Sequence, residues 1–281
     1  MPDALYQPFP MPGPARAHIW RYTPENRRPR HFHLEPELNL IAAGSGRFGV
    51  GETEVDVSAG DLLSWPPGQD HVLLQASPDF DLFVIGLTPE LSARVLGAGC
   101  AVAQGGATRI RLSATALAAL RPLCEAPLAL QDRPAVERHI GDLWQEAHAL
   151  RAATPDRHSF TRRAIASLIE RPELRRTDVA RAVGGYPTEV SRHFHKDMGL
   201  TLTAYRTRLR VLQFIRLIDD GTGNFLSAAF GSGFGSYSQC HRAFQQTLGC
   251  GPREFFGTDV REQMREAFSP WTRADRAQGL K

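Results

Sequence analysis

The sequence predicts an α+β protein with a β-rich amino-terminal half and an all-helical carboxy-terminal half. Short apolar or alternating runs, separated by turn residues, recur over residues 15–87, which is typical of strands. From residue 89 onward the apolar spacing becomes helical. The string R-x-F-x4-G also occurs twice in the carboxy-terminal half, at Arg192 and Arg242, which indicates a duplicated helical element.

The β-rich part is predicted to form a cupin-like β-barrel over residues 1–98, because many short strands with regular turns favour a barrel or a sandwich. We expect Phe48, Trp65 and Phe83 in its core. The predicted strands are Ala17–Tyr22, Leu38–Ala42, Gly46–Val50, Leu62–Trp65, His71–Leu74 and Leu82–Leu87.

Accessory helices are predicted over residues 99–155. The end of this region overlaps a predicted linker at residues 152–156. One helix follows the leucines between residues 112 and 123. The next carries an apolar stripe made of Val136, Ile140, Leu143 and Trp144. The stripe suits two roles, packing against the barrel of its own chain or forming the interface of a homodimer.

Two helix-turn-helix units are predicted within residues 156–265, at about 174–199 and 224–249, followed by a tail at 266–281. In the first unit Ala180 leaves room for a crossing helix, Gly184 allows a turn with positive φ, and Thr188 starts the second helix. The same roles in the second unit fall to Ala229, Gly233, Ser236, Cys240 and Phe244. That unit is rich in glycine and has Ser232 at a core position, so we expect a looser core.

One long helix, Leu202–Asp219, is predicted between the two units. At 1.5 Å per residue it spans about 27 Å. A rod of that length holds two recognition helices near one DNA turn, about 34 Å, apart.

Residues 160–257, with their two R-x-F-x4-G strings, resemble the DNA-binding domain of the AraC/XylS family of transcription regulators. The resemblance implies that double-stranded promoter DNA is a partner, and that RNA polymerase is another. It implies base contacts by exposed residues early in each second helix: Thr188, Ser191, Arg192, Tyr237, Ser238, Gln239 and Arg242. We expect phosphate contacts from His195, Lys196 and Arg206.

A histidine motif in the β-rich part, His31-x-His33-x3-Glu37, resembles the first motif of a cupin. His71, which follows Gly60-x5-Pro66-x-Gly68, resembles the second, with Gln75 where an asparagine is usual. His31 and His33 project from the same face of a strand. Three imidazoles and one carboxylate suit a divalent transition metal as cofactor, although a metal-free effector pocket and an inherited remnant remain alternatives.

Composition also bears on the location of the protein, the state of its cysteines and the part that meets nucleic acid. No apolar run approaches the roughly 20 residues of a membrane helix, and the amino terminus lacks the features of a signal peptide, so we expect a cytoplasmic protein without a membrane partner. The four cysteines form no C-x-x-C pair, which makes reduced thiols the simplest interpretation. Residues 1–155 carry an acidic excess and residues 156–265 a basic excess, so only the second part is expected to meet a polyanion.

These observations favour a transcription regulator, not an enzyme, whose amino-terminal domain senses a small molecule or a metal. The alternative is a cupin metalloenzyme with an appended DNA-binding module. The sequence leaves activation, repression, target genes and effector identity open.

Overall fold

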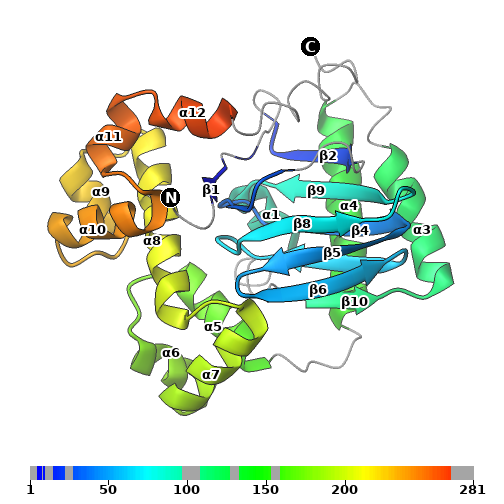
Figure 1. The fold of residues 1–281 in the computed structure, drawn as a ribbon, viewed down its shortest axis with the longest axis horizontal. Coiled ribbons are helices and arrows are strands. Elements are labelled where there is room, and N and C mark those ends of the chain that lie inside the picture. Colours follow the sequence, from blue (N-terminus) through cyan, green and yellow to red (C-terminus); the bar gives the residue numbers. More distant parts are fainter. Residues whose placement is uncertain are drawn as a thin grey trace.

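The computed structural model describes residues 5–7, 9, 15–22, 28–96, 108–126, 133–152 and 159–266. The predicted linker at 152–156 and tail at 266–281 fall almost wholly outside these residues. Figure 1 shows the strands gathered in one half of the molecule and helices α5 to α12 in the other, with helix α8 between the two helix-turn-helix units. No helix among the described residues is long and apolar enough to cross a membrane.

The strands form two five-stranded sheets, with orders β1-β3-β8-β5-β6 and β10-β7-β4-β9-β2. This is the double-sheet arrangement of a jelly roll and not a closed barrel. The bounds are β1 Leu5–Tyr6, β2 Ala17–Tyr22, β3 His31–Phe32, β4 Glu37–Ala43, β5 Ser45–Val50, β6 Thr53–Ser58, β7 Asp61–Trp65, β8 His71–Ala76, β9 Asp81–Leu87 and β10 Thr108–Arg111. All six predicted strands are confirmed to within two residues at each end, and β1, β3, β6 and β10 are additional.

Strand β4 shows how the sequence builds two layers, because successive side chains of a strand point to opposite faces. Leu38 and Leu40 belong to the apolar cluster on the helix side of their sheet. Ile41 belongs to the cluster between the sheets, where Glu37 meets His71 of strand β8. Strand β4 therefore places a carboxylate in the interior between the sheets.

Helices α1 (Pro89–Leu96), α3 (Ala114–Glu125) and α4 (Arg133–Ala152) accompany the second sheet. Ile140, Leu143 and Trp144 of α4 are buried in one cluster with side chains of β2, β4 and β9, and Val136 packs against that cluster. Of the two roles predicted for this stripe, packing on its own domain is therefore the one observed, and the stripe is not a free dimer surface.

The carboxy-terminal helices match the predicted pattern. They are α5 Ser159–Glu170, α6 Arg176–Val183, α7 Pro187–Met198, α8 Leu202–Asp219, α9 Phe225–Gly231, α10 Tyr237–Leu248, α11 Pro252–Gly257 and α12 Val260–Glu266. Gly184 and Gly233 have the positive φ values that their turns require, 73° and 86°. Thr188 lies in the first turn of α7, while Ser236 caps α10 by accepting a hydrogen bond from the Gln239 amide.

The two units have separate cores. Phe194 and Tyr205 are fully buried in the core of the first. In the second, Phe214, Phe244 and Phe255 are fully buried. The buried hydroxyl of Ser232 donates to the Ala228 carbonyl, so this polar residue leaves no unpaired group.

Candidate functional site

Four predicted ligands converge between the two sheets. His31 lies on β3, His33 just beyond it, His71 on β8, and Glu37 comes from β4 of the opposite sheet. Their exposed fractions are 4%, 2%, 3% and 3%. The imidazole ring of His71 lies 4.4 Å from that of His31 and 5.5 Å from that of His33, measured between ring centroids.

The backbone fixes the orientation of all three imidazoles. Nδ1 of His31 lies 2.8 Å from the Pro29 carbonyl oxygen, and Nδ1 of His33 lies 2.8 Å from that of Glu35. Nδ1 of His71 lies 3.2 Å from the carbonyl oxygen of Gln69. A carbonyl oxygen only accepts, so each Nδ1 carries the proton and each Nε2 keeps its lone pair. Metal-binding histidines are oriented in this way by their outer partners.

Glu37 is held by a chain of hydrogen bonds that the sequence did not reveal. The Asn39 amide donates to Glu37 Oε1 at 2.6 Å, and the Trp65 indole donates to Asn39 Oδ1 at 2.7 Å. The Trp65 ring also stacks on His71, with ring centroids 5.0 Å apart and an interplanar angle of 4°. Trp65, predicted as core, therefore also positions the site. The alternation Glu37-x-Asn39 along a strand was the available signal for the role of Asn39.

The protonation states of the site residues suit the binding of a cation. Burial lowers the pKa of His31 well below its usual value and that of His71 to about 4, so both rings are neutral near pH 7. Burial alone would raise the pKa of Glu37, but His71, His33 and Asn39 outweigh it and lower the value to about 2. Neutral imidazole and ionised carboxylate are the forms that bind metals.

The donor set fits a metal ion. His33 Nε2 and Glu37 Oε2 are buried without a hydrogen-bond partner, although they lie only 3.0 Å apart. A ligand atom from each of His31, His33 and His71 lies within 4.8 Å of the others. Two ligands at about 2.1 Å from a tetrahedral zinc ion are about 3.4 Å apart, so these donors need at most about 1.4 Å of closure.

The segment that precedes His71 connects this site to helix α8. Asp70 is buried and accepts hydrogen bonds from Arg208 Nη1 of α8 at 2.6 Å and from Arg30 Nη1 at 3.0 Å. Burial alone would raise the pKa of Asp70, but Arg208 and Arg30 outweigh it and lower it. The Arg208 guanidinium also lies 4.5 Å from the ring centroid of Phe32, the residue between His31 and His33. We call Asp70, Arg30 and Arg208 the clamp.

Further hydrogen bonds join the two halves beside the clamp, and one runs from Arg208 itself to the carbonyl of Gly68 at 2.8 Å. The Tyr205 hydroxyl of α8 donates to the carbonyl of Pro67 at 2.8 Å. The Gln69 side chain donates to the carbonyl of Met198, at the end of α7, at 3.2 Å. The amide of Glu52 donates to the Gly199 carbonyl at 2.8 Å. The sensor half therefore forms hydrogen bonds with both the long helix α8 and the end of the first recognition helix.

The predicted base-reading residues lie near the starts of α7 and α10. Most are exposed to solvent, whereas Ser191 is half-buried and its hydroxyl donates to the Pro187 carbonyl of its own helix. The exposed members, together with the predicted phosphate ligand Lys196, are Thr188, Arg192, Ser238, Gln239 and Arg242.

Four other predicted DNA contacts have protein partners in this arrangement, and one of them is Gln239, whose Oε1 accepts a hydrogen bond from the Gly235 amide at 3.1 Å. The Arg206 guanidinium donates to the carbonyl of Leu174, and burial lowers its pKa. His195 Nε2 lies 3.7 Å from a Glu52 carboxylate oxygen of the sensor half. Tyr237 is half-buried and packs against the core of the second unit. The sequence pattern could not reveal the partners of Arg206 and His195, because they lie far away in the sequence.

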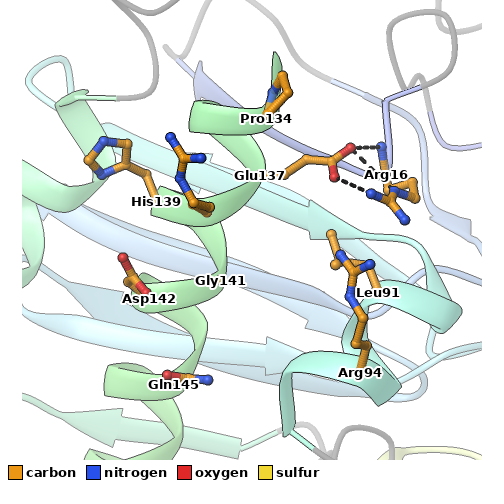
Figure 2. Close-up of a pocket in the computed structure, with 10 residues that line it drawn as sticks. Arg16, Leu91, Arg94, Pro134, Glu137, His139, Gly141, Asp142 and Gln145 are labelled. Carbon is orange, nitrogen blue, oxygen red and sulfur yellow. Dashed lines mark hydrogen bonds and ion pairs between the residues drawn. The ribbon is translucent and has the colours of Figure 1, made fainter. Parts of the chain in front are cut away.

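A separate hollow of about 470 Å³ lies beside helix α4. Figure 2 shows Glu137 of α4 joined to Arg16 across it, a pair whose Nη2 and Oε2 atoms lie 2.8 Å apart. Arg94 and Asp142 also line it. None of the predicted site residues lies there.

Comparison with known proteins agrees with this architecture. A family profile described as an AraC-like ligand binding domain matches residues 13–170, and one described as a helix-turn-helix domain matches residues 179–258. No curated protein sequence matches the chain.

Solved structures of low similarity are also found. ToxT from Vibrio cholerae is 11% identical over 85% of this chain and 96% of that chain, with a TM-score of 0.42. The AraC-like transcriptional activator CuxR is 18% identical over 73% of each chain, with a TM-score of 0.35. Oxalate decarboxylase from Bacillus subtilis is 26% identical over 26% of this chain and 20% of its own, with a TM-score of 0.23.

Proposed function

This chain belongs to the AraC family of DNA-binding transcription regulators, and we propose that its amino-terminal ligand-binding domain is a sensor for a divalent transition metal. The ligands would be His31, His33, His71 and Glu37. The observation that carries the proposal is the tethering of all three Nδ1 atoms to backbone carbonyls, which leaves the Nε2 lone pairs for a cation. Three nitrogens and one oxygen suit Zn, Fe, Mn, Ni or Cu.

Direct metal analysis tests the site. Purified full-length protein loaded with each metal in turn and then desalted should retain about one equivalent of the preferred ion. His71→Ala should lose it, because three ligands remain and one wall of the site opens. His139→Ala, which alters a histidine on α4 outside the cluster, is the matched control and should retain the ion. Equal metal content in the wild type and in His71→Ala would contradict the proposal.

The clamp supplies a route from this site to the DNA-binding domain. Strand alternation directs His31 into the site and its neighbour Phe32 outward, under Arg208 of helix α8. Asp70, which holds Arg208, immediately precedes His71. A shift of either histidine on ligand binding would therefore move a direct neighbour that contacts α8, and so bias the arrangement of the two recognition helices.

Arg208→Ala tests this route without altering a metal ligand. The variant should keep its metal equivalent and still bind DNA selected by the wild type from a random library. Its DNA affinity should no longer depend on metal, whereas the wild-type affinity should change severalfold between metal-loaded and metal-free protein. Retention of the full metal response in Arg208→Ala would exclude the clamp as the route.

DNA recognition is proposed for exposed side chains of both units. Arg192 and Arg242 would read guanine, and Gln239 would read adenine once its side chain leaves the Gly235 amide. Thr188 and Ser238 would make smaller contacts, as would the half-buried Ser191 if its hydroxyl leaves the Pro187 carbonyl. Lys196 would bind phosphate, giving salt-dependent affinity. Because they have protein partners, Arg206, His195 and Tyr237 become DNA contacts only if those partners separate.

A metalloenzyme with an appended DNA-binding module remains the second candidate, because the His cluster also suits catalysis. Substrate turnover that disappears in His71→Ala would favour it. We also propose RNA polymerase as a partner, homodimer formation and a cytoplasmic location. A homodimer would need a surface other than the buried stripe of helix α4.

A further inference from the structure

A second pocket lies where the sensor half meets the DNA-binding half, apart from the His cluster. Its volume is about 510 Å³, within the range of about 300–1,000 Å³ that is usual for small-molecule sites. The sensor half supplies one leucine and three prolines to its wall: Leu34, Pro36, Pro67 and Pro89. Domain interfaces are a common location of ligand sites.

The opposite wall comes from helices α5, α8 and α9. Leu168 and Leu209 line it from the core of the first unit. Phe230, near the end of α9, also lines it and is 55% exposed, unlike the buried phenylalanines of the second core. An open aromatic face beside aliphatic walls suits an apolar ring.

Two of the three charged side chains that line this pocket are acidic. Glu170 and Glu173 both line it, and neither carboxylate has an ion-pair partner within 4.0 Å among the described residues. The lining Arg216 is already held by Glu90 at 2.7 Å and by Asp220 at 3.5 Å.

The nearby Arg210 is also engaged. Its Nε donates to the carbonyl of Pro172 at 2.7 Å, and its guanidinium lies 5.7 Å from the Phe234 ring centroid. It does not line the pocket. Arg210 interacts electrostatically with Glu173 but forms no ion pair with it, so both lining carboxylates can accept hydrogen bonds from a ligand.

We propose that this pocket binds a small organic cation with an aromatic or branched apolar body. The ammonium or amidinium group would lie between Glu170 and Glu173, where charge-assisted hydrogen bonds are available. The apolar body would rest against Phe230 and Leu209. The inference does not depend on the His cluster.

Occupancy of this pocket has a consequence for regulation. Sensor residues such as Pro67 and DNA-binding residues such as Phe230 form one site only while the two halves keep this arrangement. A ligand that needs both walls stabilises that arrangement in proportion to its affinity. The protein would then integrate two inputs, one at the His cluster and one at the joint between its halves.

The test compares two ligands with one ring system and opposite charge on the full-length protein. By isothermal calorimetry at pH 7, naphthylmethylamine should bind at least about tenfold more tightly than naphthylacetate. Glu170→Gln/Glu173→Gln should bring the two affinities within about threefold of each other, because the charge preference is removed. Phe230→Ala should weaken both ligands by about tenfold.

A control variant locates the binding. Glu146→Gln, which alters an exposed carboxylate on helix α4, should leave the affinity for the amine unchanged. Equal binding of the two ligands by the wild type, a preference for the amine that survives the double Gln variant, or amine binding weakened by Glu146→Gln would each overturn the inference.

Discussion

The two helix-turn-helix units meet the sensor half in different ways. The first unit keeps a core of its own and meets the sensor through hydrogen bonds at the end of its recognition helix, from Glu52 to Gly199 and from Gln69 to Met198. The second unit shares its core with Tyr6 and Phe32 of the sensor. Tyr6 lies 5.9 Å from the Phe255 ring, measured between centroids.

The difference matters because the two kinds of contact respond differently to a signal. A protein hydrogen bond contributes a net of about 1 kcal/mol and exchanges readily with water. Burial of a large aromatic side chain contributes more and is lost only when the surfaces separate. We therefore expect a signal to release the end of the first recognition helix more easily than the second unit, whose core includes side chains of the sensor.

Phe32→Ala should disrupt the core that anchors the second unit on the sensor and have the largest effect on stability. It removes a ring that is 1% exposed and should lower the free energy of unfolding by about 3–5 kcal/mol. Trp20, Trp65 and Trp144 all lie in the sensor half, and Trp271 falls outside the described residues, so in a Trp271→Phe background fluorescence follows the sensor half. Far-ultraviolet circular dichroism follows mainly the helices. In urea the two signals should separate in the variant.

A matched control for this change is Phe230→Ala. That ring is exposed, so its removal should alter stability by no more than about 0.5 kcal/mol. If Phe32→Ala left both urea transitions coincident and unshifted, the shared core would not anchor the second unit.

Gly199→Ala and Gly249→Ala compare the two units at equivalent positions. Both glycines end a recognition helix with positive φ, 63° and 76°, so both substitutions should cost about 1 kcal/mol of backbone strain. A methyl group on Gly199 would also meet the Val50 carbonyl and the Glu52 amide of the sensor. Gly249 is exposed.

Overpacking at Gly199 should therefore add about 1–3 kcal/mol to the loss of stability, measured by urea unfolding of the two variants side by side. Limited proteolysis should cut between the halves faster in Gly199→Ala than in Gly249→Ala. Equal losses and equal cleavage would mean that the sensor does not hold the first unit.

How much of this the sequence predicts depends on how local each feature is. Leu202–Asp219 is predicted to the residue, because its apolar spacing is a local signal, and in the structure Thr201 caps its start. The strand Thr53–Ser58 is missed, since Glu54 and Asp56 face solvent and its order comes from pairing with β5. Strand β3 has two residues and exists only through its partners.

The residues of the candidate site also fall into those that local sequence spacing predicts and those that only long-range contacts bring together. The spacing of His31, His33 and Glu37 is local, and the structure does bring these residues together with His71. The clamp joins Asp70 to Arg208, which are 138 positions apart, and no pattern in a single sequence marks such a pair. Long-range polar contacts become visible only when tertiary packing is known.

Arg192→Ala and Arg242→Ala test whether the first or the second helix-turn-helix unit, the one anchored on the sensor, contributes more to sequence-specific DNA binding. Both side chains are exposed near the start of a recognition helix, where an arginine can form a bidentate contact with guanine. We expect Arg192→Ala to weaken binding to a selected site by about 1–3 kcal/mol and to relax one base position, and Arg242→Ala to cost below about 1 kcal/mol. Fluorescence anisotropy on the selected site and on its point variants measures both quantities. A larger loss in Arg242→Ala would make the anchored unit the main reader, and a signal at the sensor would then adjust affinity through the first unit without setting specificity.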